Sequence, residues 1–188
     1  MEAFLISLSS VATAEMGDRT QLLALVLAAR FRKPWPMVAG VLCATVANHA
    51  IAGLLGVWLG RLLNPARLNM LVGVSMIAMA LWTLKPDKLD EEQSTVSGAG
   101  AFLATLVAFF IAEIGDKTQI ATVALAAAYS NLWTVVAGTT SGMMMANVPV
   151  IFLGNAFAHR LPLRAIHYVA SVLFLVIGLV FVWRSGLF

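Results

Sequence analysis

Residues 14–21 read AEMGDRTQ and residues 112–119 read AEIGDKTQ, so an eight-residue motif occurs twice in the chain. Six of its eight positions are identical, and the two copies are offset by 98 residues. Asn48 is matched by Asn147 at an offset of 99. This repetition predicts a chain built from two related halves.

The sequence around the two motifs is strongly apolar. Of its 188 residues, 61% are hydrophobic and only 11% are charged. Soluble globular domains average about 25% charged residues. Mean hydropathy is +0.91, and the single cysteine, Cys43, excludes an intrachain disulfide framework. A net charge of +3 without a basic stripe argues against a nucleic-acid partner. The composition favours a polytopic membrane protein.

Charged residues, proline and glycine divide the chain into six long apolar runs. They cover residues 3–29, 35–59, 68–84, 100–128, 132–158 and 164–183. A transmembrane helix needs about 20 predominantly apolar residues, and backbone groups within a bilayer must be satisfied internally. The predicted fold class is therefore an all-α polytopic membrane protein with six transmembrane helices.

The motif copies lie in the first and fourth predicted helices. Three helices, an odd number, separate equivalent positions, so the halves are expected to insert with opposite orientations, as in many secondary transporters. We predict a first three-helix repeat at 1–84, a polar linker at 85–99 and a second three-helix repeat at 100–188.

The distribution of Lys and Arg predicts the orientation. Connections after the first, third and fifth helices carry seven basic residues, Arg30, Arg32, Lys33, Lys85, Lys88, Arg160 and Arg164. The opposite side carries three, Arg61, Arg67 and Arg184. Basic loops favour the cytoplasm, so linker 85–99 is expected inside and both termini outside.

Six charged residues fall within the predicted helices, and all belong to the motifs. They are Glu15, Asp18, Arg19, Glu113, Asp116 and Lys117. Each would cost about 2.5–3.5 kcal/mol at a helix centre, which makes intramembrane charges functional candidates. On a continuous helix the two acids of one motif would share a face at i,i+3. Gly17 and Gly115, between the acids, would ease a local break.

These side chains predict a site for a hard divalent cation. The four carboxylates are the candidate ligands, with Asn48, Asn147, Gln21 and Gln119 as auxiliary ligands. Oxygen donors suit Mg²⁺, Ca²⁺ or Mn²⁺. Arg19 and Lys117 would tune the proton affinity of the acids. Four carboxylates and two cations leave a charge of −2 (2 − 4), which one divalent cation or two protons would neutralise. The alternative is a pair of structural ion pairs, Glu15–Arg19 and Glu113–Lys117.

Four further residues are weaker candidates. Thr20 and Thr118 follow the charged residues of each motif and add hydroxyl oxygens. His49 could relay protons or supply a nitrogen ligand, but a lone histidine is more often hydrogen-bonded to a neighbour. Met144, in the run 143–145, could add a soft sulfur, although such methionines more often serve packing.

The doubled motif resembles that of a known cation/proton exchanger family. Its members, the Golgi-type calcium/manganese transporters and related bacterial manganese exporters, carry two copies of Glu-x-Gly-Asp-(Lys/Arg)-(Thr/Ser) in a three-plus-three helix arrangement. Residues 15–20 and 113–118 fit that pattern completely. The resemblance implies exchange of Mn²⁺ or Ca²⁺ for protons, with the motif acids as ion ligands. The compact length resembles the bacterial members, which implies manganese export across the inner membrane.

Other functions remain open from the sequence. A Ca²⁺/H⁺ exchanger would use the same site. A passive divalent-cation channel or a non-transporting membrane assembly subunit would also contain buried charges. Enzymatic activity is not expected, because the sequence has no nucleophile–base pair and no phosphate-binding glycine loop. No cofactor is expected beyond the transported ions, and the oligomeric state is not predicted.

Overall fold

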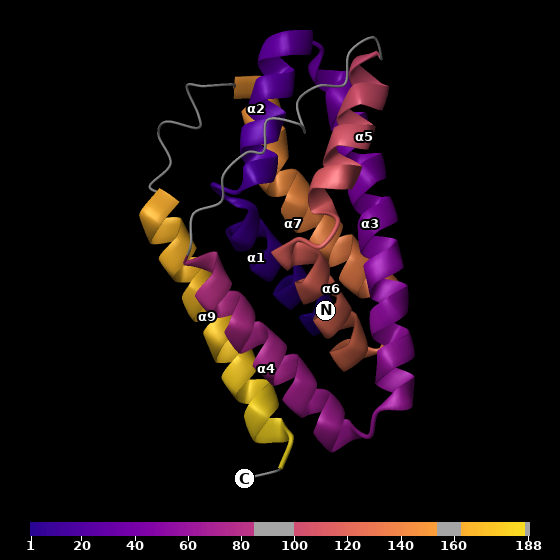
Figure 1. The fold of residues 1–188 in the computed structure, drawn as a ribbon, viewed down its shortest axis with the longest axis vertical. Coiled ribbons are helices and arrows are strands. Elements are labelled where there is room, and N and C mark those ends of the chain that lie inside the picture. The colour runs from indigo at the N-terminus through magenta and orange to yellow at the C-terminus, as the bar shows by residue number, and fades with distance from the viewer. Residues whose placement is uncertain (85–99, 154–162, 187–188) are drawn as a thin grey trace.

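The computed structural model describes residues 1–84, 100–153 and 163–186, and within these ranges the chain forms helices and no strand (Figure 1). The helices are α1 (Glu2–Glu15), α2 (Arg19–Phe31), α3 (Pro34–Leu62), α4 (Pro65–Thr83), α5 (Ala101–Glu113), α6 (Lys117–Tyr129), α7 (Leu132–Leu153) and α9 (Leu163–Arg184). The predicted all-α class is confirmed for these residues. The predicted linker, 85–99, lies outside them.

Three helices in the described ranges are by themselves long and apolar enough to cross a membrane: α3, α4 and α7. They begin within three residues of the predicted runs at 35–59, 68–84 and 132–158. Helix α9 coincides with the run at 164–183. Pro34 and Pro65 each stand in the first turn of a helix, where the missing N–H costs no intrahelical hydrogen bond.

The runs at 3–29 and 100–128 are not continuous helices, contrary to the expectation from their length. The first divides into α1 and α2, and the second into α5 and α6. Gly17 has φ +82° and Gly115 has φ +73° at the two breaks. Glycine adopts positive φ readily because it has no Cβ. Both breaks lie near the middle of the long axis (Figure 1), and the motif acids beside them are buried.

Close helix crossings connect the two halves of the chain. Helix α1 packs on α7, and α5 packs on α3. A Cβ added at Gly138 would lie 2.6 Å from the Phe4 carbonyl oxygen, and one at Gly40 would lie 2.7 Å from that of Phe102. Both glycines and both carbonyls are offset by 98 residues, like the motifs. Small residues permit such backbone approach in membrane proteins, so the same crossing is built twice.

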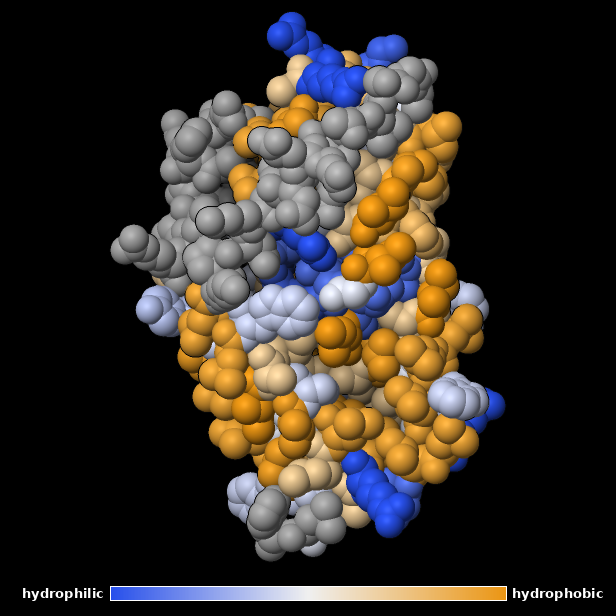
Figure 2. Space-filling view, viewed as in Figure 1, coloured by the Kyte–Doolittle hydropathy of each residue, from blue (hydrophilic) through white to orange (hydrophobic). Residues whose placement is uncertain are grey.

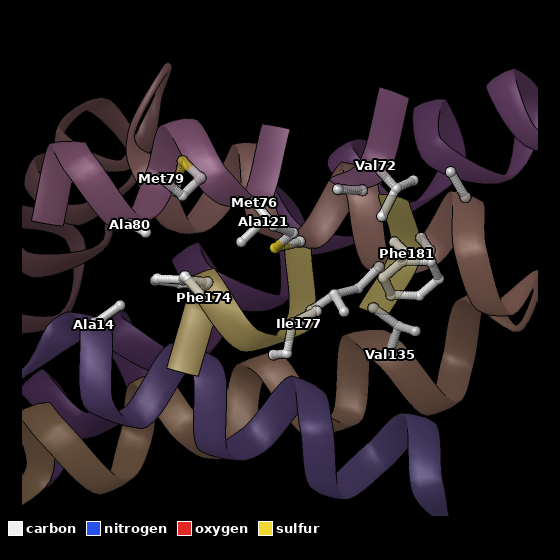
Figure 3. Packing of buried hydrophobic residues seen from close by; sticks show 14 of the residues in the cluster. Ala14, Val72, Met76, Met79, Ala80, Ala121, Val135, Phe174, Ile177 and Phe181 are labelled. Carbon is white, nitrogen blue, oxygen red and sulfur yellow. The ribbon is translucent and has the colours of Figure 1, made fainter. Parts of the chain in front are cut away.

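Two apolar clusters complete the packing. One joins α4, α6 and α9 through residues such as Met76, Phe174 and Phe181 (Figure 3). The other joins α2, α3 and α5, with Leu27 and Phe109 fully buried or nearly so. Hydrophobic residues also cover much of the visible surface, and hydrophilic residues gather at the two ends and in a patch near mid-height (Figure 2). That surface suits a lipid environment.

Candidate metal centre

The two helix breaks bring acidic residues from both halves together. Glu15 ends α1 and Glu113 ends α5, whereas Asp18 and Asp116 are the N-cap residues of α2 and α6. Glu15, Glu113 and Asp116 each offer a carboxylate oxygen, and these three oxygens lie within 4.8 Å of one another. All three residues are buried. Convergence of the two motifs, expected from the repeat, is thus observed.

The observed ion pairs join one motif to the other. Arg19 Nη2 lies 3.1 Å from Asp116 Oδ1, and Lys117 Nζ donates to Asp18 Oδ1. The prediction that the acids of one motif share a face of one helix is wrong, because the chain breaks between them. The same break removes the i,i+4 geometry on which the alternative of ion pairs within a motif depended. The equivalent cations instead meet the aspartates of the opposite half.

Each glutamate accepts a hydrogen bond from the threonine of its own motif. Thr20 Oγ1 donates to Glu15 Oε2 at 2.5 Å, and Thr118 Oγ1 donates to Glu113 Oε2 at 3.1 Å. The sequence makes these threonines weak ligand candidates and does not predict that they orient the glutamates. The signal was present, because a hydroxyl residue stands five positions after the glutamate in both copies.

The threonine hydrogen bonds engage only one of the two carboxylate oxygens of each glutamate. Glu15 Oε1 and Glu113 Oε1 are buried and have no hydrogen-bond partner among the described residues. An unsatisfied buried polar atom is costly and requires a specific explanation. Two such oxygens lie in one cluster and come from residues offset by 98, and a cation or protons there would satisfy them.

Gln21 and Gln119 stabilise the turns. The Gly17 N–H donates to Gln21 Oε1 at 2.9 Å, and the Gly115 N–H donates to Gln119 Oε1 at 2.8 Å. Gln21 Nε2 also donates to the Ala146 carbonyl oxygen in α7 at 2.9 Å. Both amide oxygens predicted as auxiliary ligands are therefore engaged by backbone in this structure.

The two asparagines differ in their surroundings. Asn48 Nδ2 donates to the Phe110 carbonyl oxygen across to α5 at 3.1 Å. Asn147 Nδ2 donates to the Met143 carbonyl oxygen within α7 and lies 3.0 Å from the Met143 sulfur. Asn147 Oδ1 is buried without a partner among the described residues. The methionine beside Asn147 is the buried Met143 rather than Met144, which is only half-buried.

His49 is completely buried in α3. Neither ring nitrogen has a hydrogen-bond partner within the described part of the chain. The expectation of a histidine satisfied by a neighbour is therefore not met there. His49 is also not one of the three residues whose ligand atoms cluster.

The cluster has the chemistry of a hard-cation site. Its donors are carboxylate oxygens, which divalent cations such as Mn²⁺ and Ca²⁺ prefer. Two cationic side chains on the neighbouring aspartates leave the six motif residues with a net charge of −2 (2 − 4). The arrangement can therefore hold one divalent cation or exchange it for protons.

Comparison with known proteins identifies similar sequences. The family described as "Divalent cation/proton antiporter GDT1" matches residues 3–91 and 101–186. A Vibrio cholerae serotype O1 protein named "Putative manganese exporter" is 51% identical over 180 residues, covering 95% of this chain and 90% of that protein. "GDT1-like protein sll0615" of Synechocystis is 28% identical over 98% of both chains.

A plant protein is also similar. "Protein PAM71, chloroplastic" of Arabidopsis thaliana is 33% identical over 88% of this chain and 52% of its own length. No solved structure gives a significant match to the chain.

Proposed function

Because the chain belongs to the GDT1 family of divalent cation/proton antiporters, we propose that it exports Mn²⁺ from the cytoplasm in exchange for protons. Membership makes the chain a membrane transporter of divalent cations rather than an enzyme. The choice of manganese and of export is supported by the name of the relative that is 51% identical.

The observation that carries the proposal is the convergence of Glu15, Glu113 and Asp116 oxygens within 4.8 Å. We assign these three residues to the ion, with Asp18 joining when Lys117 moves away. Asn147 is a further candidate because its Oδ1 is buried and unpartnered among the described residues. We also assign Asn48 of α3 as an auxiliary ligand, because it is buried and its amide reaches the Phe110 carbonyl oxygen of α5, the helix that ends at Glu113. Gln21 and Gln119 would hold the turns, and they become ligands only if they release the glycine N–H groups.

The ion pairs across the motifs suggest how the empty site is stabilised. Arg19 and Lys117 act as tethered counter-ions for the two aspartates. An arriving Mn²⁺ would compete with them for the carboxylates, and departing Mn²⁺ would be replaced by them and by protons. Charge neutrality of the cluster then needs two protons for each Mn²⁺, which fits the −2 charge of the six motif residues.

For the architecture, we propose six membrane spans in two inverted repeats. In this arrangement α1–α2 and α5–α6 each form one interrupted span. The crossings at Gly40 and Gly138, offset by 98 residues, support the equivalence of the halves. Interrupted helices that place ion ligands near the midplane are common in transporters with such repeats.

The proposed location is the bacterial inner membrane, with linker 85–99 in the cytoplasm and both termini outside. The support is the excess of Lys and Arg in the connections after the first, third and fifth spans. Arg32 and Lys33, between α2 and α3, would then lie at the cytoplasmic surface.

Transport by the purified protein tests this function. The protein is reconstituted into vesicles with a pH gradient and an interior fluorescent Mn²⁺ indicator. We expect uphill Mn²⁺ movement coupled to counterflow of protons, abolished by Glu113→Gln. Glu2→Gln is the matched control, because Glu2 is an exposed carboxylate of α1 outside the cluster.

The other candidate functions give different results in the same vesicles. Preferred flux of Ca²⁺ over Mn²⁺ would identify a calcium exchanger. Mn²⁺ flux that a proton gradient cannot drive uphill would identify a passive channel. Absence of flux from a folded protein would support an assembly subunit.

A further inference from the structure

A cavity of about 420 Å³ opens at the end of the molecule where α2 connects to α3. Its walls come from α2, the start of α3 and the end of α7, and they include Leu25, Met37 and Ile151. Arg32 and Lys33 lie at the same cavity, and both are exposed. The cavity therefore combines apolar walls with two positive charges.

The second repeat has no such combination at the equivalent place. At the offset of 98 residues, Arg32, Lys33 and Pro34 correspond to Ser130, Asn131 and Leu132. Arg32 and Ser130 even share a left-handed conformation, with φ 52° and φ 50°. The two junctions thus have the same backbone turn, but only the first has cations.

The second junction is also closely packed. A Cβ added at Gly53 would lie 2.5 Å from Leu132 Cδ1, and one at Gly56 would lie 2.2 Å from the Val123 carbonyl oxygen. Helix α3 therefore lies directly against α6 and the start of α7. At the first junction α7 presents Phe152 and Leu153 instead, and the cavity remains between α7 and α2. A smaller cavity of about 180 Å³ touches Val123 and Ala127 of α6, but it opens toward α4 and has no cation in its lining. Among the described residues, the larger cavity is the one that combines apolar walls with cations.

From this coincidence we propose that the cavity binds an anionic phospholipid. Arg32 and Lys33 would hold the headgroup phosphate, for which a guanidinium is geometrically suited. The walls would take the upper part of one acyl chain. Basic pockets between membrane helices are recognised headgroup sites. An inorganic anion would use the charges but leave the apolar walls uncovered.

The aromatic residues at the rim support a position at the membrane interface. Trp35 is 72% exposed, and its ring lies 5.3 Å from that of Phe152 in an edge-to-face arrangement. Tryptophan is enriched at the level of lipid headgroups. Hydrophilic residues gather at the end of the molecule where α2 ends and α3 begins (Figures 1 and 2).

Lipid binding can be measured without any transport assay, so its result is independent of the function proposed above. The purified protein in neutral detergent is titrated with phosphatidylglycerol or phosphatidylcholine of equal chain length. Native mass spectrometry counts bound lipids, and thermal unfolding reports stabilisation. We expect phosphatidylglycerol to bind roughly tenfold more tightly and to raise the midpoint of unfolding, because it supplies the anionic headgroup.

Two variants separate the two parts of the site. Arg32→Gln with Lys33→Gln removes the charges. Ala29 also lines the cavity, and Ala29→Phe fills it without changing charge. Both are expected to abolish the preference for phosphatidylglycerol. Arg61→Gln with Arg67→Gln is the matched control and should keep the preference. Both arginines are exposed, Arg61 in the last turn of α3 and Arg67 in the first turn of α4.

Three outcomes would overturn the proposal. Equal binding of the two lipids would exclude headgroup recognition. Full preference in Ala29→Phe would reduce the effect to surface charge without a cavity. Displacement of phosphatidylglycerol by millimolar inorganic phosphate would identify a simple anion site.

Discussion

Arg19 of the first motif and Asp116 of the second form an ion pair, with Nη2 and Oδ1 3.1 Å apart. The Asp116 side chain is 3% exposed, and that of Arg19 is 21% exposed. Asp116 is thus buried, whereas its partner Arg19, which lies 97 residues away in sequence, is partly exposed. The equivalent pair, Lys117 with Asp18, is more deeply buried on both sides.

We expect Arg19→Gln to lower the thermal stability of the ion-free protein, because Asp116 would remain buried without its counter-ion. Adding Asp116→Asn should recover part of the loss. The coupling between the two changes should fall in the range of about 0.5–3 kcal/mol. Thermal unfolding of the four proteins in detergent provides the double-mutant cycle.

Lys117→Gln provides an internal comparison. Its side chain is 3% exposed, against 21% for Arg19, so its removal should destabilise the protein more.

Additive effects of Arg19→Gln and Asp116→Asn would show that the ion pair does not stabilise the empty site. Recovery of Arg19→Gln stability by added Mn²⁺ would agree with competition between cation and metal.

The threonines are expected to control metal affinity. Thr20→Val and Thr118→Val keep the shape of the side chain but remove the hydroxyl that holds Glu15 or Glu113. Loss of a hydrogen bond to a metal ligand typically weakens metal binding by about 10–100-fold. Isothermal titration of Mn²⁺ into the detergent-solubilised protein measures the effect. Thr20→Ser, which restores a hydroxyl, should recover most of the affinity.

Thr139→Val is the control for the threonine series. Thr139 is also completely buried, and its hydroxyl donates only to the Val136 carbonyl oxygen of its own helix at 3.2 Å. It should leave Mn²⁺ affinity unchanged. Equal weakening by Thr139→Val would mean that the effect comes from general loss of packing rather than from orientation of the glutamates.

Much of the helix arrangement follows from local sequence, but the pairing at the site does not. The apolar runs that form α3, α4 and α9 end at charged residues and prolines, so the sequence predicts the limits of these helices to within a few residues. Gly17 and Gly115 signalled a possible break. Whether the chain actually breaks depends on the tertiary packing of the flanking half-helices, which helical spacing does not report. Because the spacing assumes one continuous helix, it predicts the wrong neighbours for Glu15 and Asp18.

The roles of individual polar side chains were less predictable still. Gln21 and Gln119 were read as ligands because of their oxygen atoms, but a positive-φ glycine leaves a free N–H that competes for those oxygens. Met144 is the candidate from the sequence, but the methionine beside Asn147 is the buried Met143, and consecutive helical residues differ only in direction. The choice depends on which face of α7 is covered by its neighbours, chiefly α1 and α3.

The left-handed glycine of the second motif can be tested without a steric clash. A Cβ at Gly115 meets nothing within 4 Å, yet φ is +73°. Gly115→Ala should therefore cost only the conformational penalty, about 1–2 kcal/mol, and reduce transport by favouring a continuous helix. Gly115→Asn should be milder, because asparagine tolerates this conformation.

Gly100→Ala is the control for Gly115. It also has nothing within 4 Å of an added Cβ, and its φ is −64°. Because Gly100 is the N-cap residue of α5, where alanine is less favourable than glycine, stability should fall by no more than about 0.5 kcal/mol. Flux should be unaffected. A Gly115→Ala protein with normal stability and flux would show that the turn does not need a left-handed residue.

The duplicated helix crossing depends on one glycine in each half, Gly40 and Gly138. A Cβ at Gly40 would lie 2.7 Å from the Phe102 carbonyl oxygen, and one at Gly138 would lie 2.6 Å from that of Phe4. Backbone cannot give way as a flexible side chain can, so the helices must separate. We expect Gly40→Ala and Gly138→Ala each to destabilise the protein by about 1–3 kcal/mol, measured as similar falls in the midpoint of thermal unfolding.

A similar loss of stability in Gly40→Ala and Gly138→Ala tests the equivalence of the two halves more directly than the size of either loss does. If the halves are equivalent, Gly40→Ala pushes α5 away from α3 just as Gly138→Ala pushes α1 away from α7. Each substitution then displaces a helix that ends in a site glutamate. Mn²⁺ affinity should then fall in both variants, whereas Gly100→Ala should leave affinity unchanged and cause only the small loss of stability expected at an N-cap. A loss confined to Gly138→Ala would contradict the equivalence, because the Gly40 crossing would then adapt in a way that its counterpart cannot.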